Sequence, residues 1–177
     1  MQYISYYQSP LGSMMLASDL YGLTGLWFVG DRFYAEHLSP ENAEKETSVM
    51  TETKRWLDTY FSGQIPAEPP LIHLTGTAFQ REVCEIMLRI PYGTTRTYGS
   101  IAEEIARRRN LRRMSAQAVG AAVGHNPVCI IVPCHRVVGA GGNLTGYGGG
   151  IYRKIKLLTL EKVDMNGFYI PKHGNAL

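Results

Sequence analysis

Residues 128–138 of this 177-residue chain read Val128-Cys129-Ile130-Ile131-Val132-Pro133-Cys134-His135-Arg136-Val137-Val138. The apolar residues on both sides predict a buried strand, and an interior thiol is normally inert because a low dielectric disfavours the thiolate. Here His135 and Arg136 follow Cys134 directly, and an imidazole and a guanidinium can both favour the thiolate form. The pattern therefore predicts a nucleophile that the fold protects.

Composition limits the classes of protein that this chain can belong to. The apolar share of 45% and the charged share of 19% are typical of a soluble globular protein. The sequence has neither a run of about 18 apolar residues for a membrane span nor a signal-peptide pattern at its start. Cys84, Cys129 and Cys134 form no CxxC motif, so we expect reduced thiols, a cytoplasmic location and no zinc site.

The net charge of +3 conceals an asymmetry. Residues 1–72 carry 4 basic and 9 acidic side chains, whereas residues 73–166 carry 13 basic and 6 acidic side chains. A basic half suggests a polyanionic partner, and a solvated basic surface explains the same charge equally simply.

The N-terminal part predicts three short strands at 3–7, 13–18 and 23–29, separated by turns that suit antiparallel pairing. Ser39-Pro40-Glu41 predicts the start of a helix that runs to Phe61. Residues 62–70, rich in Gly and Pro, are the candidate linker.

The C-terminal part predicts helices that are capped by Thr77, Thr97 and Ser115. The helix after Ser115 consists of small residues and ends at Gly124, and with the preceding helix it resembles a helix-turn-helix, although tight packing against a sheet fits as well. A last helix is expected at 151–163, with Lys154 largely outward. Seven glycines between 137 and 150 predict a loop that folds against a flat ligand or a set of tight turns.

Several motifs together resemble the O6-alkylguanine-DNA alkyltransferases. They are Gly124-His125-Asn126-Pro127, Ile131-Val132-Pro133-Cys134-His135-Arg136-Val137-Val138-Gly139 and Leu144-Thr145-Gly146-Tyr147, with Ala118-Val119-Gly120 upstream and Glu161 downstream. The resemblance covers residues 77–162 and, more loosely, the N-terminal part. It implies an α+β fold: a ribonuclease H-like N-terminal subdomain with a small antiparallel sheet, and a mostly helical C-terminal subdomain with a winged-helix-like helix-turn-helix. The domains expected are a scaffold at 1–72, a DNA-binding and acceptor domain at 73–166 and a tail at 167–177.

The resemblance also implies a mechanism. Cys134 accepts an alkyl group from O6 of guanine, or more weakly from O4 of thymine, in a single irreversible event. His135 acts as base through a water molecule, Glu161 orients it, Tyr98 protonates the leaving base and Asn126 braces the turn before the cysteine. Tyr98 equally fits a residue that faces the core.

For DNA, the resemblance implies that the damaged base is flipped from the minor groove of duplex DNA by a monomer, with no cofactor, no metal, no membrane and no obligate protein partner. The expected DNA contacts are Thr97, Arg112, Arg113, Ser115, Ala116, Gln117, Gly120 and Arg136. The expected base pocket is Val123, Pro133, Val137, Tyr147 and Gly148. In this sequence Gln117 stands where the family has an arginine that fills the duplex gap, Gly148 stands where some members have serine, and the loop before Ser115 is about five residues longer.

Two other functions fit part of the pattern. One is a lesion-binding module without chemistry, against which the presence of Cys134 argues. The other is a cysteine hydrolase that uses Cys134 and His135, whose side chains diverge if both lie on one strand.

Overall fold

The computed structural model describes residues 1–171 and divides the chain into two compact units. Unit 1 comprises residues 1–76 and 127–131, and unit 2 comprises residues 77–126 and the chain from Val132 onward. Strands dominate unit 1 and helices dominate unit 2, so the predicted α+β class is confirmed. The chain leaves unit 2 just after Asn126 and returns two residues before Cys134.

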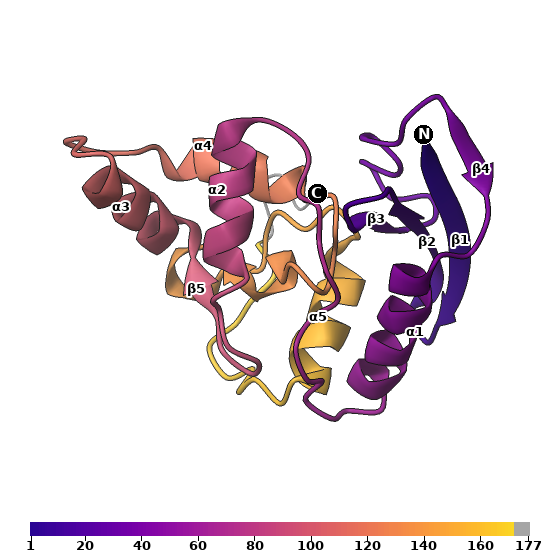
Figure 1. Ribbon diagram of the computed structural model, residues 1–177. Coiled ribbons are helices and arrows are strands. Elements are labelled where there is room, and N and C mark those ends of the chain that lie inside the picture. The colour runs from indigo at the N-terminus through magenta and orange to yellow at the C-terminus, as the bar shows by residue number, and fades with distance from the viewer. Residues whose placement is uncertain (172–177) are drawn as a thin grey trace. The chain divides into compact units, whose positions relative to one another are not determined.

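Unit 1 is a four-stranded sheet in the order β3-β2-β1-β4, and helix α1 lies against β1 and β2 (Figure 1). The pairs β1–β2 and β2–β3 are antiparallel, as predicted, and β4 is parallel to β1. The elements are β1 (Gln2–Ser9), β2 (Gly12–Ser18), β3 (Leu23–Phe28), β4 (Asn42–Glu44) and α1 (Ser48–Phe61).

The predicted helix start at Ser39 is wrong. The Ser39 hydroxyl accepts from the Glu41 amide within a tight turn, and the chain then forms β4. The amide of Gln2 donates to the Glu41 carbonyl at 3.0 Å, and the amide of Lys45 donates to the Ile4 carbonyl at 3.0 Å. Sheet pairing satisfies this backbone, so α1 begins only at Ser48, after Thr47.

The predicted strand through Cys134 is also wrong in its second half. Residues 127–129 do extend along β3, where the Leu26 amide donates to the Pro127 carbonyl at 2.8 Å. Cys134–Arg136 instead form a single 3-10 turn, η1, in which the Arg136 amide donates to the Pro133 carbonyl at 2.9 Å. Pro133 has no amide hydrogen to continue a strand ladder, so the chain turns there.

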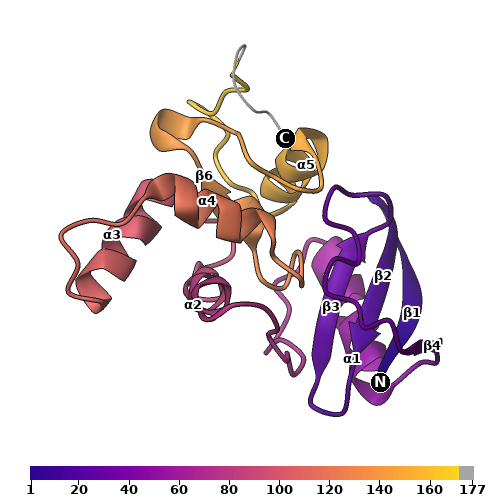
Figure 2. The same cartoon turned by 90° about the horizontal axis from the view of Figure 1, so that it is seen from above.

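Unit 2 packs α3 and α2 against α4, and Figure 2 shows α3 and α4 joined by a long turn. The predicted caps are confirmed: Thr77 and Gln80 form a capping box, Thr97 accepts from the Ser100 amide and Ser115 accepts from the Ala118 amide. The elements are α2 (Ala78–Met87), β5 (Arg96–Thr97), α3 (Tyr98–Arg108), α4 (Ala116–Gly124), η1 (Cys134–Arg136), β6 (Val137–Val138), η2 (Ala140–Gly142) and α5 (Ile151–Leu160).

Helix α5 carries the largest departure from the sequence pattern. Leu158 is buried with Val138 and Leu144, as its spacing indicates. Lys154, expected to point outward, is fully buried. Its side chain therefore needs polar partners inside unit 2, which places it in the site described below.

Within residues 1–171, no helix is long and apolar enough to cross a membrane. The same residues contain no group of three or more His, Cys, Asp or Glu side chains that could hold a metal ion.

Candidate active site

Cys134 begins the η1 turn in unit 2, and the residue is buried, with 6% of its surface exposed. The short parallel pair β5–β6 joins Arg96 and Thr97 to Val137 and Val138, and so fixes the chain immediately after η1 to the start of α3. The elements that meet around the sulfur are thus the end of α4, the η1 turn, α5 and the N-terminus of α3.

Asn126 holds the cysteine from the end of α4. Its Nδ2 donates to the Val132 carbonyl at 2.7 Å and to the Cys134 Sγ at 3.0 Å. The first bond fixes the chain before Pro133, and the second directs an N–H donor at the sulfur. A donor in this position stabilises a negatively charged sulfur more than a neutral thiol.

Lys154 supplies the positive charge that acts on the Cys134 sulfur. Its Nζ donates to the Val137 carbonyl at 2.6 Å and to the Thr145 carbonyl at 2.9 Å, and lies 5.9 Å from the centre of the Tyr98 ring. Burial lowers the pKa of Lys154 to about 8, and the negative charge of a Cys134 thiolate opposes that shift. Sequence spacing missed this residue, because a lysine in an amphipathic helix usually lies on the solvated face.

His135, Glu161 and Arg136 form a buried network. Glu161 Oε1 lies 2.7 Å from His135 Nε2, and the Arg136 guanidinium donates to both carboxylate oxygens at 2.8 and 2.9 Å. Glu161 also accepts from the Gly93 amide, and Arg136 donates to the Ile90 carbonyl. Burial alone raises the pKa of Glu161, but the hydrogen bonds and charges of His135 and Arg136 outweigh it and bring that pKa down to about 2.

The network fixes the protonation state of the histidine. Burial lowers the pKa of His135 although Glu161 opposes this, so the imidazole is neutral at pH 7. Because the carboxylate accepts at Nε2, the proton of the neutral ring is on Nε2, and Nδ1 carries the lone pair that can accept a proton. Consecutive residues of a 3-10 helix point about 120° apart, so His135 and Cys134 diverge less than on a strand.

The sulfur is a thiol at rest. Burial raises the pKa of Cys134, while the Asn126 hydrogen bond and the Lys154 charge oppose that shift. The sequence suggested that the imidazole of His135 and the guanidinium of Arg136 favour the thiolate; in the structure burial lowers the pKa of His135, so its imidazole is neutral, and Arg136 pairs with Glu161. The groups that lower the pKa of the Cys134 thiol are the Asn126 side chain, the charge of Lys154 and the backbone amides of Cys134 and His135.

Tyr98, at the N-terminus of α3, is half-buried and its hydroxyl lies 3.0 Å from the Thr145 carbonyl and 3.1 Å from the Gly146 carbonyl. Gly146 has φ +74, and a Cβ there would lie 2.6 Å from the Tyr98 oxygen, so only glycine allows this approach. Burial, with a contribution from Cys134, raises the pKa of Tyr98, which therefore keeps its proton at neutral pH.

Of the five residues expected to form the base pocket, four are buried and Gly148 is half-buried. The buried residues are Val123, Pro133, Val137 and Tyr147.

The residues expected to contact DNA divide into two groups. Ser115, Ala116 and Gln117 are exposed at the start of α4, Arg112 and Arg113 are exposed on the turn before it, and Thr97 and Gly120 are half-buried. Arg136, by contrast, is 8% exposed and pairs with Glu161. Its guanidinium has its partners inside the protein, so it is a positioning residue for the network and not a contact of the DNA.

Comparison with known proteins identifies the family. Residues 78–163 match the 6-O-methylguanine DNA methyltransferase DNA binding domain, and residues 2–68 match the ribonuclease-like domain of the same family. The methylated-DNA–protein-cysteine methyltransferase of Mycobacterium leprae is 43% identical over 156 residues, which is 87% of this chain and 88% of that protein. The protein of the same name from Methanosarcina acetivorans is 39% identical over 159 residues, 90% of this chain and 97% of that protein.

The structure of Mycobacterium tuberculosis OGT in complex with DNA superposes with a TM-score of 0.79 at 41% identity and covers 90% of this chain and 92% of that one. Both units are therefore matched by one family, in sequence and in fold. The chain belongs to the 6-O-methylguanine DNA methyltransferase family.

Proposed function

We propose that this protein repairs DNA by transferring the methyl group of O6-methylguanine to the sulfur of Cys134. The observation that carries the proposal is the surroundings of Cys134: an amide donor at 3.0 Å and a buried lysine, beside a neutral histidine held by a carboxylate. The relatives named methylated-DNA–protein-cysteine methyltransferase support the proposal.

The transfer is a displacement at the methyl carbon. His135, through a water molecule, takes the thiol proton at Nδ1, and the sulfur forms a bond to the methyl carbon as the bond from that carbon to O6 breaks. Glu161 stabilises the imidazolium that forms, and Arg136 holds Glu161 in place. Asn126 and Lys154 stabilise negative charge on the sulfur until the new bond forms.

The electron pair of the broken bond remains on the guanine, which leaves as an anion and needs a proton. Tyr98 holds its proton at neutral pH and lies at the start of α3, so it is the donor we assign. Its hydroxyl has to turn from the carbonyls of Thr145 and Gly146 toward O6 for this step.

The product is a thioether, a poor leaving group, so each molecule acts once. Because Cys134 is buried, a base within a stacked duplex cannot reach it, and the nucleotide has to be flipped out. We assign the contact with the minor groove to the exposed start of α4, including Gln117, and the pocket for the base to Val123, Pro133, Val137, Tyr147 and Gly148. In this proposal O4-methylthymine is the weaker substrate. Residues 73–166 carry the activity, and residues 1–72 serve as a scaffold. Part of the proposed tail, residues 172–177, lies outside the described residues.

The test is the mass of the intact protein after incubation with duplex DNA that contains one O6-methylguanine. We expect one added methyl group per molecule, located at Cys134 by peptide mapping, and no reaction in Cys134→Ser. Loss of the lesion from DNA without a mass increase in the protein would refute the proposal, as would repeated turnover. Binding of the lesion with no transfer would show a recognition module instead.

A further inference from the structure

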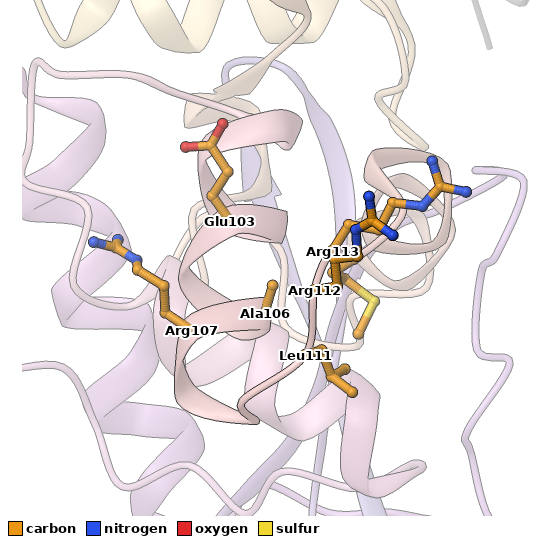
Figure 3. A pocket seen from close by; sticks show the side chains of 7 residues that line it. Glu103, Ala106, Arg107, Leu111, Arg112 and Arg113 are labelled. Carbon is orange, nitrogen blue, oxygen red and sulfur yellow. The ribbon is translucent and has the colours of Figure 1, made fainter.

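A second site lies on unit 2, beside the turn that joins α3 to α4. It is a pocket of about 380 Å³ lined by three arginines, Arg107, Arg112 and Arg113, and one glutamate, Glu103 (Figure 3). No residue of the cysteine site lines it. Its volume lies near the lower end of the range for small-ligand pockets, which suits a ligand of about the size of one nucleotide.

The shape of the pocket is fixed by the backbone at both ends of the turn. Asn110 has φ +52, and the amides of Asn110 and Leu111 donate to the carbonyls of Arg107 and Ala106 at 3.3 and 2.8 Å. This is a Schellman motif, which turns Leu111 back over the end of α3. Ser115 caps α4 at the other end, so the intervening residues are held between two fixed points.

Within the part of the chain that the structure describes, the three arginines that line the pocket make no ion pair, whereas the neighbouring arginines do. Arg96 and Arg108 both pair with Glu104, and Arg109 pairs with Glu82. Across residues 1–171, the side chains of Arg107, Arg112 and Arg113 make no hydrogen bond or ion pair. Their positive charge is therefore available to a ligand.

The lining combines charge with apolar surface. Figure 3 shows Arg112 and Arg113 projecting on one side of the pocket and Glu103 and Arg107 on the other, with Ala106 between them. Leu111, which is 46% exposed, and Met114 add apolar contact area. Guanidinium groups beside an apolar surface match a phosphate joined to a sugar.

We propose that this pocket binds the sugar–phosphate backbone of the duplex that flanks the damaged nucleotide. The inference rests on the proposed function and adds a second DNA contact to it. It also places positive charge immediately before α4, where Gln117 supplies none. In this arrangement Arg112 and Arg113 act on the phosphates.

The test compares two double variants that lose the same charge. Arg112→Gln/Arg113→Gln removes the two arginines of the turn, and Arg89→Gln/Lys162→Gln removes two exposed cations elsewhere on unit 2. Binding to an undamaged fluorescent duplex is measured by anisotropy across a series of salt concentrations. The rate of methylation of Cys134 by free O6-methylguanine, which has no phosphate, shows whether each variant is folded and reactive.

For Arg112→Gln/Arg113→Gln we expect the slope of log Kd against log salt to fall by about 2, about 1 for each lost phosphate contact. Each phosphate contact contributes about 0.9 log units of affinity for every tenfold decrease in salt below 1 M. The loss of two contacts should therefore lower the affinity about 60-fold at 0.1 M salt. The control should keep the slope of the wild type. Equal losses in both double variants, or an unchanged slope in the first, would overturn the inference.

Binding of a free nucleotide and transfer from damaged DNA give two further outcomes. If deoxycytidine monophosphate binds the wild type in an Arg112-dependent manner while duplex affinity is insensitive to the substitutions, the pocket is a site for free nucleotides and the inference is wrong. If the wild type binds duplex DNA through these arginines yet takes no methyl group from damaged DNA, the inference stands and the proposed chemistry fails.

Discussion

Replacing Glu161 by glutamine removes the one negative charge from the buried network of unit 2. The carboxylate accepts hydrogen bonds from His135, Arg136 and the Gly93 amide, and its side chain is fully buried. Glutamine keeps the size of the side chain but has one acceptor oxygen and adds an NH₂ donor that faces other donors. The Arg136 guanidinium then keeps its charge in the interior without a counter-charge.

Two independent arguments give a similar loss in the free energy of unfolding for Glu161→Gln. Removing one partner of a buried ion pair destabilises a protein by about 3–5 kcal/mol. Separately, the pKa of Glu161 falls from 4.5 to about 2 in the folded protein. At about 1.4 kcal/mol per pKa unit, that shift corresponds to about 3 kcal/mol of stability at pH 7.

The pKa shift also fixes the pH dependence. Because the folded-state pKa lies below the unfolded one, this stability is fully present above about pH 4.5 and is lost as the pH falls to about 2. The difference in stability between wild type and Glu161→Gln should therefore be largest at neutral pH and shrink across that window.

Urea unfolding, followed by circular dichroism of the helices, measures this difference at pH 7 and pH 3. Trp27 and Trp56, the two tryptophans, lie in unit 1, so their fluorescence reports on unit 1 as an internal comparison. Glu85→Gln, on an exposed position of α2, is the matched control, with an expected change within about 0.5 kcal/mol. A loss below about 1 kcal/mol for Glu161→Gln at pH 7, or a loss that does not change with pH, would refute the reasoning.

Three further changes probe the chemistry and its DNA partner. Lys154→Met removes the buried charge of Lys154, and we expect methyl transfer to slow about 100-fold. The rate of the variant should continue to rise at higher pH. A single-turnover rate equal to that of the wild type would contradict this expectation. Asn126→Ala removes the donor to Cys134 Sγ and one of the two donors to the Val132 carbonyl, which keeps its hydrogen bond from the Cys134 amide. Unfolding by urea should show a loss of about 1 kcal/mol together with slower alkylation by iodoacetamide, and an unchanged thiol reactivity would exclude the assigned role. Gln117→Arg adds a planar cation at the exposed start of α4. In a gel-based assay the rate of repair of duplex DNA should rise roughly tenfold, while the rate of reaction with free O6-methylguanine stays the same. An equal gain with both substrates would show that the substitution acts on the chemical step and not on binding of the duplex.

Local sequence signals predicted the elements whose stabilising groups are close in the chain. The caps at Thr77, Thr97 and Ser115 depend on hydrogen bonds three residues away, and all three helices begin where these residues place them. Ser39-Pro40-Glu41 carries a similar start signal, but the Glu41 carbonyl accepts from the Gln2 amide and the next residues, 42–44, pair with β1, about forty residues distant in the chain. Propensity is weak beside such pairing, so tertiary context decided that segment.

The sequence by itself determined the family, because the residues from Ile131 to Gly139 form a dense signature, and it singled out Cys134, His135 and Glu161 as the candidates for the chemistry. Only the tertiary structure decided which groups act on the sulfur. Lys154 lies twenty positions from Cys134 on a helix whose pattern favours the solvent, and Asn126 lies before a segment that belongs to the other unit. Electrostatic effects depend on distance in space and on burial, and neither quantity is contained in the spacing of residues along the chain.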